Sequence, residues 1–222
     1  MKRRRFNSTI MSATTLSALG LISSLPAMAQ QSAPIAGKDY LVLNMPVGVE
    51  APTGKIEVVD FFWYSCPHCN AFEPALEAWI SKLPLDVQIR RVPVKFRDDF
   101  EPQQRLYYTL EALNKVRELH GKVFSAIHAA KERVNTDDTI LDWATRQPEL
   151  RGSRFADVFR SFGVASKVKR AAQVQDEYRV QGVPAMGAGG RFYVDGNSAG
   201  TMARALSTVD HLIEQLRQSR KS

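Results

Sequence analysis

Residues 60–69 of the chain read Asp-Phe-Phe-Trp-Tyr-Ser-Cys-Pro-His-Cys, and they contain the only two cysteines among 222 residues. The aromatic and β-branched run that leads into them from Ile56 is typical of a strand buried on both faces of a sheet. From Asn70 to Leu83 the apolar residues recur at helical spacing. The cysteines therefore mark a strand-to-helix junction. Cys66 is expected at the helix N-terminus, where unpaired amides and the helix dipole favour a negative charge.

Further strands are predicted on both sides of this junction. A first strand is expected at Tyr40–Leu43 and a third at Val87–Val94, where Pro93 indicates a strand end or a sheet edge. A strand, a helix and a strand in this order predict parallel neighbours joined by a right-handed crossover. Near the C-terminus, residues 184–196 resemble a β-hairpin whose first strand is weakened by glycines. The last helix is predicted to begin at the capping-box pattern of residues 207–210.

The segment from Glu101 to Tyr178 has helical spacings and no strand pattern. Residues 135–138 are typical of a helix start, and Gly121, Gly152 and Gly163 are interpreted as breaks between helices. A helical insertion of about 75 residues has the length of a small bundle domain. The predicted plan is βαβ, a helical insertion, and then ββα.

The N-terminus has the pattern of a secretory signal peptide. Lys2 and Arg3–Arg5 precede a weakly apolar segment, which ends in Pro26–Ala29. This predicts that residues 1–29 are removed. A transmembrane anchor is the alternative, but the apolar part is rich in Ser and Thr and is short for a span of about 20 residues. The run Arg3–Phe6 also resembles a twin-arginine signal, which leaves the export route open.

Removal of residues 1–29 changes the charge of the working protein. The whole chain has 30 Lys and Arg against 23 Asp and Glu, and four of the basic residues lie in the signal. The mature chain then has 26 basic residues against 23 acidic ones, a net charge of +3. No basic cluster is interleaved with aromatic residues, so nucleic acid is excluded as a partner.

The Cys-x-x-Cys spacing fits either a redox pair or half of a zinc site. Zinc needs two more ligands, and the remaining histidines lie far away in sequence without close spacing: His120, His128 and His211. No metal site is therefore predicted. A structural bridge that closes so short a loop would restrict the unfolded chain little, so redox chemistry explains the pair better.

The motif assigns a role to each of its residues. Cys66 is expected to be exposed and acidic and to be the attacking thiolate, and the more buried Cys69 is the resolving thiol. Pro67 suits the first helical turn. His68 would favour the thiolate through its charge, although a spectator role is the alternative. Stabilising the thiolate stabilises only the reduced protein, which makes the protein an oxidant.

Asp60 is a carboxylate within an otherwise apolar strand. Burial without a partner would raise its pKa, because burial penalises the charged form. Asp60 is predicted to take or relay the proton of Cys69 when that thiol resolves a mixed disulfide. The alternative interpretation is an ion pair with a basic residue such as Lys55, Arg90 or Lys95.

The motifs of residues 66–69 (Cys-Pro-His-Cys) and 182–185 (Gly-Val-Pro-Ala) resemble those of the DsbA family of exported thiol:disulfide oxidoreductases. The resemblance covers essentially the whole mature chain. It implies an α/β, thioredoxin-like fold with an inserted all-helical domain between its βαβ and ββα halves. Residues 30–100 and 179–222 would form the thioredoxin-like domain, and residues 101–178 the insertion.

The resemblance also implies site roles. Asp60 stands where the family commonly has a longer Glu, which bears on its reach to Cys69. Pro184 would be a cis-proline facing the disulfide, whereas sequence alone favours an ordinary trans proline. Gly182 and Val183, just before it, would bind an extended substrate, and a surrounding apolar surface would draw on Phe62, Trp63 or Val183.

The same resemblance implies the biological setting. The protein would need no cofactor beyond the Cys66–Cys69 disulfide and would oxidise unfolded, cysteine-containing polypeptides in the periplasm. A DsbB-like, quinone-linked membrane protein would re-oxidise it. Nothing in the sequence indicates an obligate dimer. The alternatives are a reductase or isomerase on the same fold, or a non-catalytic binding module with a structural disulfide, which would retain its function with Cys66→Ser.

Overall fold

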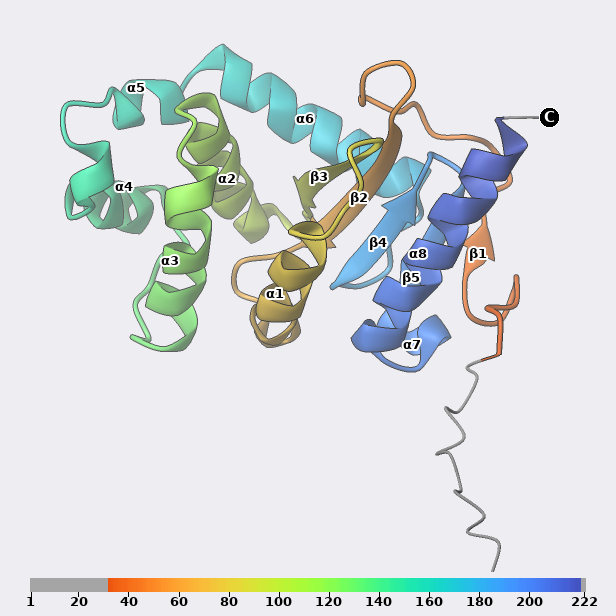
Figure 1. Cartoon of the computed structure of the whole chain (residues 1–222). Helices are drawn as coiled ribbons and strands as arrows, with labels where there is room; N and C mark the ends of the chain where they lie inside the picture. Colours follow the sequence, from red (N-terminus) through yellow and green to blue (C-terminus); the bar gives the residue numbers. More distant parts are fainter. Residues whose placement is uncertain (1–31, 221–222) are drawn as a thin grey trace, which may run out of the picture. The chain divides into compact units, whose positions relative to one another are not determined.

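A computed structural model of the protein describes residues 32–220, so the predicted signal peptide lies outside the described part. A mixed five-stranded sheet forms its centre, in the order β1-β5-β4-β2-β3 (Figure 1). Strands β2 and β3 pair in parallel, as predicted, and the other pairs are antiparallel. The strands are β1 (Leu41–Val42), β2 (Ile56–Phe62), β3 (Val87–Pro93), β4 (Ala185–Ala188) and β5 (Phe192–Asp195).

Helices cover both faces of the sheet. The helices are α1 (Pro67–Ile80), α2 (Glu101–Ala112), α3 (Val116–His128), α4 (Asp137–Thr145), α5 (Phe155–Phe159), α6 (Phe162–Glu177), α7 (Gly196–Ala199) and α8 (Met202–Ser219). One hydrophobic cluster joins α1 and α8 to the sheet, and a second joins the opposite face to the helices of residues 101–177. This α/β architecture is the predicted thioredoxin-like fold with inserted helices.

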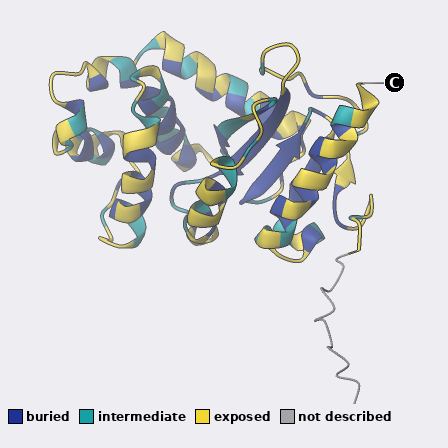
Figure 2. Ribbon diagram, viewed as in Figure 1, coloured by how far each residue is buried: buried dark blue, intermediate teal, exposed yellow. Residues whose placement is uncertain are grey.

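Strand β2 is the centre of both clusters, and all seven of its residues are buried. Figure 2 shows the sheet in the buried colour, between helices whose outer faces are exposed. Side chains alternate across a strand, so Val58 packs under α1 and α8 whereas Val59 and Phe61 face the inserted helices. Each buried Val or Phe contributes roughly 1.5–3 kcal/mol, which fixes the register of the strand that leads into the cysteines.

Several element boundaries differ from the sequence predictions. Helix α1 starts at Pro67, because proline fits the first helical position. The prediction of a capping box at residues 207–210 was wrong: α8 starts at Met202, where the Thr201 hydroxyl accepts a hydrogen bond from the Arg204 amide at 3.1 Å. The break expected at Gly121 was also wrong, because this residue lies inside α3, whereas the break expected near Gly163 is present between the end of α5 and the start of α6. Gly152 does occupy a turn, with φ +72°.

The inserted helices contain no strand between residues 101 and 178, as expected, and α4 starts at the predicted position with Thr136 as its N-cap. Their hydrophobic cluster is continuous with that of the sheet. The division into two domains remains an interpretation of the sequence. Within residues 32–220 no helix has the length and hydropathy needed to cross a bilayer.

Packing explains why strand β4 contains Gly187. A Cβ atom on Gly187 of β4 would lie 2.3 Å from the ring of Tyr178, which is buried at the end of the insertion. Only glycine lets the ring lie against the backbone at this distance. Gly187 therefore allows the end of the inserted segment to pack against the sheet, although glycine lowers strand propensity.

Candidate functional site

Cys66 is the N-cap of α1, at the end of the sheet where β2 stops. Its sulfur accepts a hydrogen bond from the amide of Cys69 at 3.4 Å. A thiolate in this position satisfies an otherwise unpaired helix amide and interacts favourably with the helix dipole. Pro67 occupies the first helical position, where its missing N–H costs no hydrogen bond. Both cysteines are free in this structure.

The two cysteines have opposite acidities. A hydrogen bond from the Cys69 thiol, together with the amides of Cys69 and His68 and the charge of His68, lowers the pKa of Cys66 to about 6. Burial raises the pKa of Cys69 far above its ordinary value. The expectation that Cys66 is well exposed was wrong, since its exposed fraction is 7% against 3% for Cys69. The pKa values thus differ because hydrogen bonds stabilise the Cys66 thiolate, whereas burial destabilises a thiolate at Cys69.

The loop before β4 lies against the sulfur of Cys66. The Val183–Pro184 peptide bond is cis, and Cys66 Sγ lies 3.6 Å from the Val183 carbonyl oxygen. The residues are 117 positions apart, and the antiparallel pairing of β4 with β2 brings them together. The predicted proximity of Pro184 to the cysteines is therefore present in the fold.

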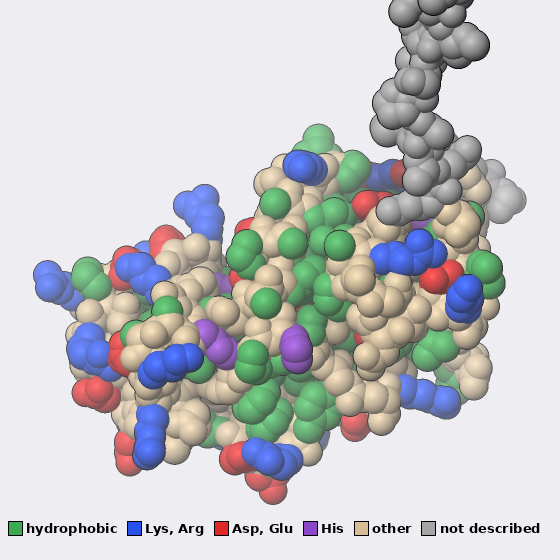
Figure 3. Space-filling view, turned by 90° about the horizontal axis from the view of Figure 1, so that it is seen from below, with side chains coloured by type: hydrophobic (Ala, Val, Ile, Leu, Met, Phe, Trp, Pro, Cys, Tyr) green, Lys and Arg blue, Asp and Glu red, His purple; other side chains and the backbone are tan. Residues whose placement is uncertain are grey.

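A shallow cavity of about 360 Å³ opens beside this loop. It is lined by His68, Gly182, Val183, Pro184, Asp195, Gly196, Asn197 and Met202. Figure 3 shows the face on which α1 begins, with hydrophobic side chains gathered at its centre and charged ones around its margin. Trp63 and Val183 are half-buried and contribute apolar surface, whereas Phe62 is only 2% exposed and does not.

Asp60 is buried beneath α1, on the face of β2 that also bears Val58. Desolvation raises its pKa to about 7, although the charge of Arg91 opposes this shift. The ion pair with a basic residue that the sequence offered as the alternative is present, but its partner is Arg91, at 3.4 Å from Nε to Oδ2, and not one of the three residues named there. The charge of Asp60 in turn contributes to the raised pKa of Cys69, so the two groups interact electrostatically.

A second buried acid on β2 is better paired. Glu57 accepts two hydrogen bonds from Arg90, each of 3.1 Å, and one from the Glu50 amide at 2.9 Å. Arg90 and Arg91 are consecutive residues of a strand, so they serve opposite faces. The Lys95 ammonium binds Asp98 and Glu101 instead of Asp60.

Sequence reasoning missed Arg91, Glu73 and His120, which complete the surroundings of Asp60. Glu73 and Glu77 are one helical turn apart on α1, a spacing that could have indicated a shared partner. His120 had no comparable signal, because α3 meets α1 only through the tertiary fold. His120 is buried among aromatic rings.

In the described part of the chain, the surroundings of the cysteines offer no metal-binding group. Within residues 32–220 no three His, Cys, Asp or Glu side chains are grouped so that they could hold a metal ion.

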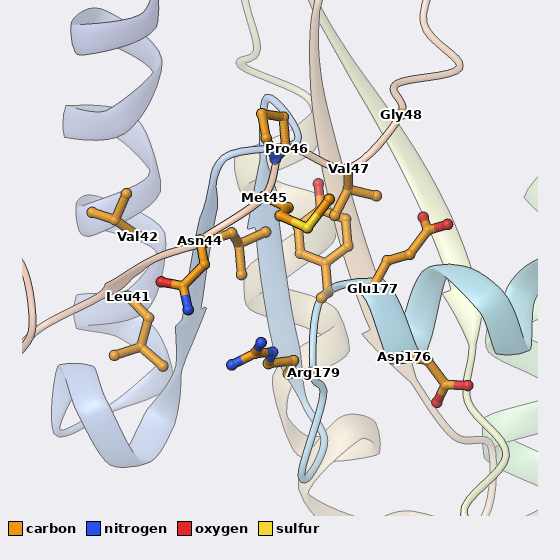
Figure 4. Close-up of a pocket in the computed structure, with 12 residues that line it drawn as sticks. Leu41, Val42, Asn44, Met45, Pro46, Val47, Gly48, Asp176, Glu177 and Arg179 are labelled. Atoms are coloured by element: carbon orange, nitrogen blue, oxygen red, sulfur yellow. The ribbon is translucent and has the colours of Figure 1, made fainter.

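A separate cavity of about 490 Å³ lies between the chain around β1 and the end of α6 (Figure 4). Met45 and Val47 from the first segment and Glu177 and Arg179 from the second line it, and it includes neither cysteine and no residue of the cavity beside Val183 and Pro184.

In this protein a buried strand leads to a Cys-x-x-Cys motif at a helix N-terminus, and the proline loop before the C-terminal β-hairpin lies opposite the motif. This combination defines a thioredoxin-fold protein with a redox-active dithiol. The chain matches the model of the DSBA-like thioredoxin domain over residues 57–207. It is 36% identical over 207 residues to the thiol:disulfide interchange protein DsbA of Burkholderia cepacia, covering 93% of this chain and 97% of that protein. It is 40% identical over 210 residues to the protein of the same name from Bordetella parapertussis, covering 94% and 96%.

A solved structure agrees with these relatives. The crystal structure of Pseudomonas aeruginosa DsbA superimposes with a TM-score of 0.76 at 36% sequence identity, covering 85% of this chain and 97% of that one. The chain belongs to the DsbA-like thioredoxin family.

Proposed function

We propose that the protein is a thiol:disulfide oxidoreductase that donates its Cys66–Cys69 disulfide to cysteine-containing polypeptides through a mixed disulfide at Cys66. The observation that carries the proposal is the opposite acidity of the two thiols at one helix N-terminus. A thiolate at Cys66 is stabilised, whereas the disulfide has no charge that could benefit from the same interactions. The disulfide is therefore readily given up.

Donation of the disulfide takes two exchange steps. A substrate thiolate attacks Cys66 Sγ, and the Cys66–Cys69 bond breaks as the Cys66–substrate bond forms. Cys69 leaves with the electron pair and takes a proton, because burial raises its pKa; protonated Asp60 is the proposed donor. A second substrate thiolate then attacks the substrate sulfur and releases Cys66 as a thiolate. Two substrate thiols are oxidised to a disulfide, and the protein is reduced to a dithiol.

Re-oxidation uses the same groups in reverse. The Cys66 thiolate attacks the disulfide of the oxidising partner, and Cys69 then loses its proton and attacks Cys66 Sγ in the mixed disulfide. The partner's thiolate leaves, and the Cys66–Cys69 bond is restored. A carboxyl group that titrates near neutrality can both give and take the proton, which is why the pKa of about 7 at Asp60 suits this role.

The substrate surface supports loose recognition. The cavity beside Val183 and Pro184 is shallow, and its neighbourhood is apolar with half-buried Trp63. An extended chain can bind there through its backbone without a demand for particular side chains. We propose unfolded polypeptides as substrates, the periplasm as the location, a DsbB-like quinone-linked membrane protein as the oxidant, and a monomeric state. Family membership and the signal-like N-terminus support these assignments.

The deciding experiment is the equilibrium of the purified protein with glutathione at pH 7. An oxidase should give a potential more oxidising than about −180 mV, and a value near −270 mV would instead assign the protein as a reductase. Cys66→Ser is the matched control and should abolish exchange with a cysteine-containing peptide. Retained activity of that variant would support the non-catalytic alternative.

A further inference from the structure

A cluster of charged side chains lies between α1, β2, β3 and α3, with Arg91 at its centre. Arg91 Nη2 lies 2.6 Å from Glu73 Oε1 and 2.7 Å from Glu77 Oε1, and Nε lies 3.4 Å from Asp60 Oδ2. Within residues 32–220, Asp60 Oδ2, Arg91 Nε and His120 Nε2 are buried without a hydrogen bond. Buried polar atoms without a hydrogen bond are uncommon in folded proteins, and a catalytic role is one explanation for three of them in a single cluster.

Three carboxyl groups converge on the single guanidinium of Arg91. Burial raises the pKa of Glu73 to about 7, and burial together with the negative charges of Glu73 and Glu77 raises the pKa of Asp60 to about 7. One guanidinium cannot neutralise both of these buried carboxyls in addition to Glu77. Small differences in their surroundings therefore decide which carboxyl carries the proton.

His120 faces Glu73 from the other side. Its Nδ1 lies 2.8 Å from the Tyr64 hydroxyl, and its Nε2 lies 3.4 Å from Glu73 Oε1. Burial keeps the pKa of Tyr64 well above 10, so the hydroxyl is protonated and can donate to Nδ1. Burial, and then the charge of Arg91, lower the pKa of His120 well below 6.5, so the ring is neutral. Nε2 faces the Glu73 carboxyl group, which only accepts hydrogen bonds when it is ionised, so we assign the single ring hydrogen to Nε2 and the acceptor role to Nδ1.

The inserted helix fixes this arrangement relative to the cysteines. His120 and His128 both belong to α3, and His128 Nε2 lies 2.8 Å from the Tyr64 carbonyl. Helix α3 thus contacts Tyr64 at its hydroxyl and at its carbonyl, two residues before Cys66. Gln103 of α2 donates to the Ser65 hydroxyl at 2.8 Å, which holds the next residue of the same turn.

We propose that His120 is a positioning residue of the redox site. Its N–H lies beside Glu73 and thereby keeps the proton of this cluster on Asp60, from which Cys69 receives it. That Cys69 receives this proton rests on the proposed function. The N–H stabilises ionised Glu73, and ionised Glu73 favours protonated Asp60. The other ionisable groups around the ring are Glu77 on α1, Arg91 on β3 and Tyr107 on α2. The insertion thereby acts on the chemistry of a strand with which it shares no backbone pairing.

The test is a carbon-13 NMR titration of the Asp60 and Glu73 carboxyl groups in the purified, reduced protein. In His120→Phe, which keeps an aromatic ring but has no nitrogen, the Glu73 midpoint should rise and the Asp60 midpoint should fall. A shift of about one pH unit in each corresponds to a tenfold change in where the proton lies. His120→Gln can donate and accept, and should restore the original midpoints at least in part. His211→Phe, on the exposed face of α8, is the matched control and should change neither.

Two results would overturn the proposal: unchanged midpoints in His120→Phe, or midpoints that move in the same direction, as loss of packing would cause. If His120→Phe does not fold, Tyr64→Phe decides, because it removes the donor that fixes the tautomer. It should produce smaller shifts in the same two directions, and unchanged midpoints would again overturn the proposal. The titration does not depend on oxidase activity. A redox potential in the reductase range would reject the proposed function. The titration midpoints of Asp60 and Glu73 would still test the role of His120 independently.

Discussion

Asp60 and Arg91 are register partners on adjacent parallel strands, and their side chains form a 3.4 Å ion pair that does not meet the geometry of a hydrogen bond. Glu57, three residues earlier on β2, accepts two hydrogen bonds from Arg90. The well-paired acid faces the inserted helices, and the poorly paired acid lies under the active-site helix. This difference between two buried acids of one strand leads to the first two predictions.

Asp60→Asn should stabilise the protein at neutral pH. The pKa of Asp60 is raised from 3.8 to about 7, so its ionisation destabilises the folded state as the pH rises from about 4 to 7. The variant should gain nothing below pH 4 and about 2–4 kcal/mol above pH 7. Chemical unfolding at several pH values measures the gain. Glu57→Gln is the matched comparison and should destabilise, because it leaves Arg90 buried without its partner. An Asp60→Asn gain that is independent of pH would contradict this account.

Asp60→Asn should also slow the steps in which Cys69 exchanges a proton. Loss of a positioned proton donor and acceptor typically costs about 100-fold. Stopped-flow measurement should show this loss in the resolution of a mixed disulfide by Cys69. The initial attack by Cys66 should change little, because its thiolate is formed at the helix N-terminus. Equal effects on both steps would argue against the proton role.

The stability difference between reduced and oxidised protein should depend on pH. The pKa of Cys66 in the folded reduced protein is about 6, below its ordinary value of 9.0. The stabilisation of the reduced form is therefore fully present above about pH 9 and is lost as the pH falls through about 6. Between these limits the difference should change by up to about 1.4 kcal/mol per pH unit, the value for one proton. Thermal unfolding of both forms from pH 5 to 9 measures it, and a flat difference would rule out an acidic Cys66.

His68→Leu should raise the pKa of Cys66. The variant removes the ring charge near the sulfur but retains the backbone amide, so the rise should be about one unit or less. Thiolate absorbance at 240 nm against pH reports the midpoint. The same substitution at exposed His211 controls for the loss of a histidine. If both variants match the wild type, His68 is a spectator, which is the alternative interpretation of the sequence.

Gly187→Ala should destabilise the contact between the insertion and the sheet. The new Cβ would lie 2.3 Å from Tyr178 Cε1, and overpacking of this kind typically costs about 1–3 kcal/mol. The same change in a Tyr178→Ala background should cost less than about 1 kcal/mol. Gly121→Ala is the matched control. Gly121 is exposed inside α3 with no atom within 4 Å of the new Cβ, so alanine should stabilise by about 0.5–1 kcal/mol. Urea unfolding measures all four proteins.

Local sequence determined much of the redox centre. The apolar run into Cys66 specified a buried strand, and Pro67 together with the helical spacing after it specified a helix whose N-terminus bears the nucleophile. These features depend on residues within one or two turns of each other. The same holds for the Thr136 helix start and for the hairpin of β4 and β5. The start of α8 was misplaced because Ser207–Asp210 carries a capping pattern that the preceding Thr201 cap overrides.

Tertiary structure alone decided which distant groups surround the cysteines. The pairing of β4 with β2 places Val183 against Cys66, and the pairing of β3 with β2 gives Asp60 to Arg91 instead of to the basic residues considered from sequence. The packing of α3 against α1 brings His120 to Glu73. The acidity of a buried group depends on desolvation and on charges within a few ångströms. The sequence therefore identified the cysteine pair and its place at the helix N-terminus, whereas the fold decided which groups surround the two thiols and set their acidities.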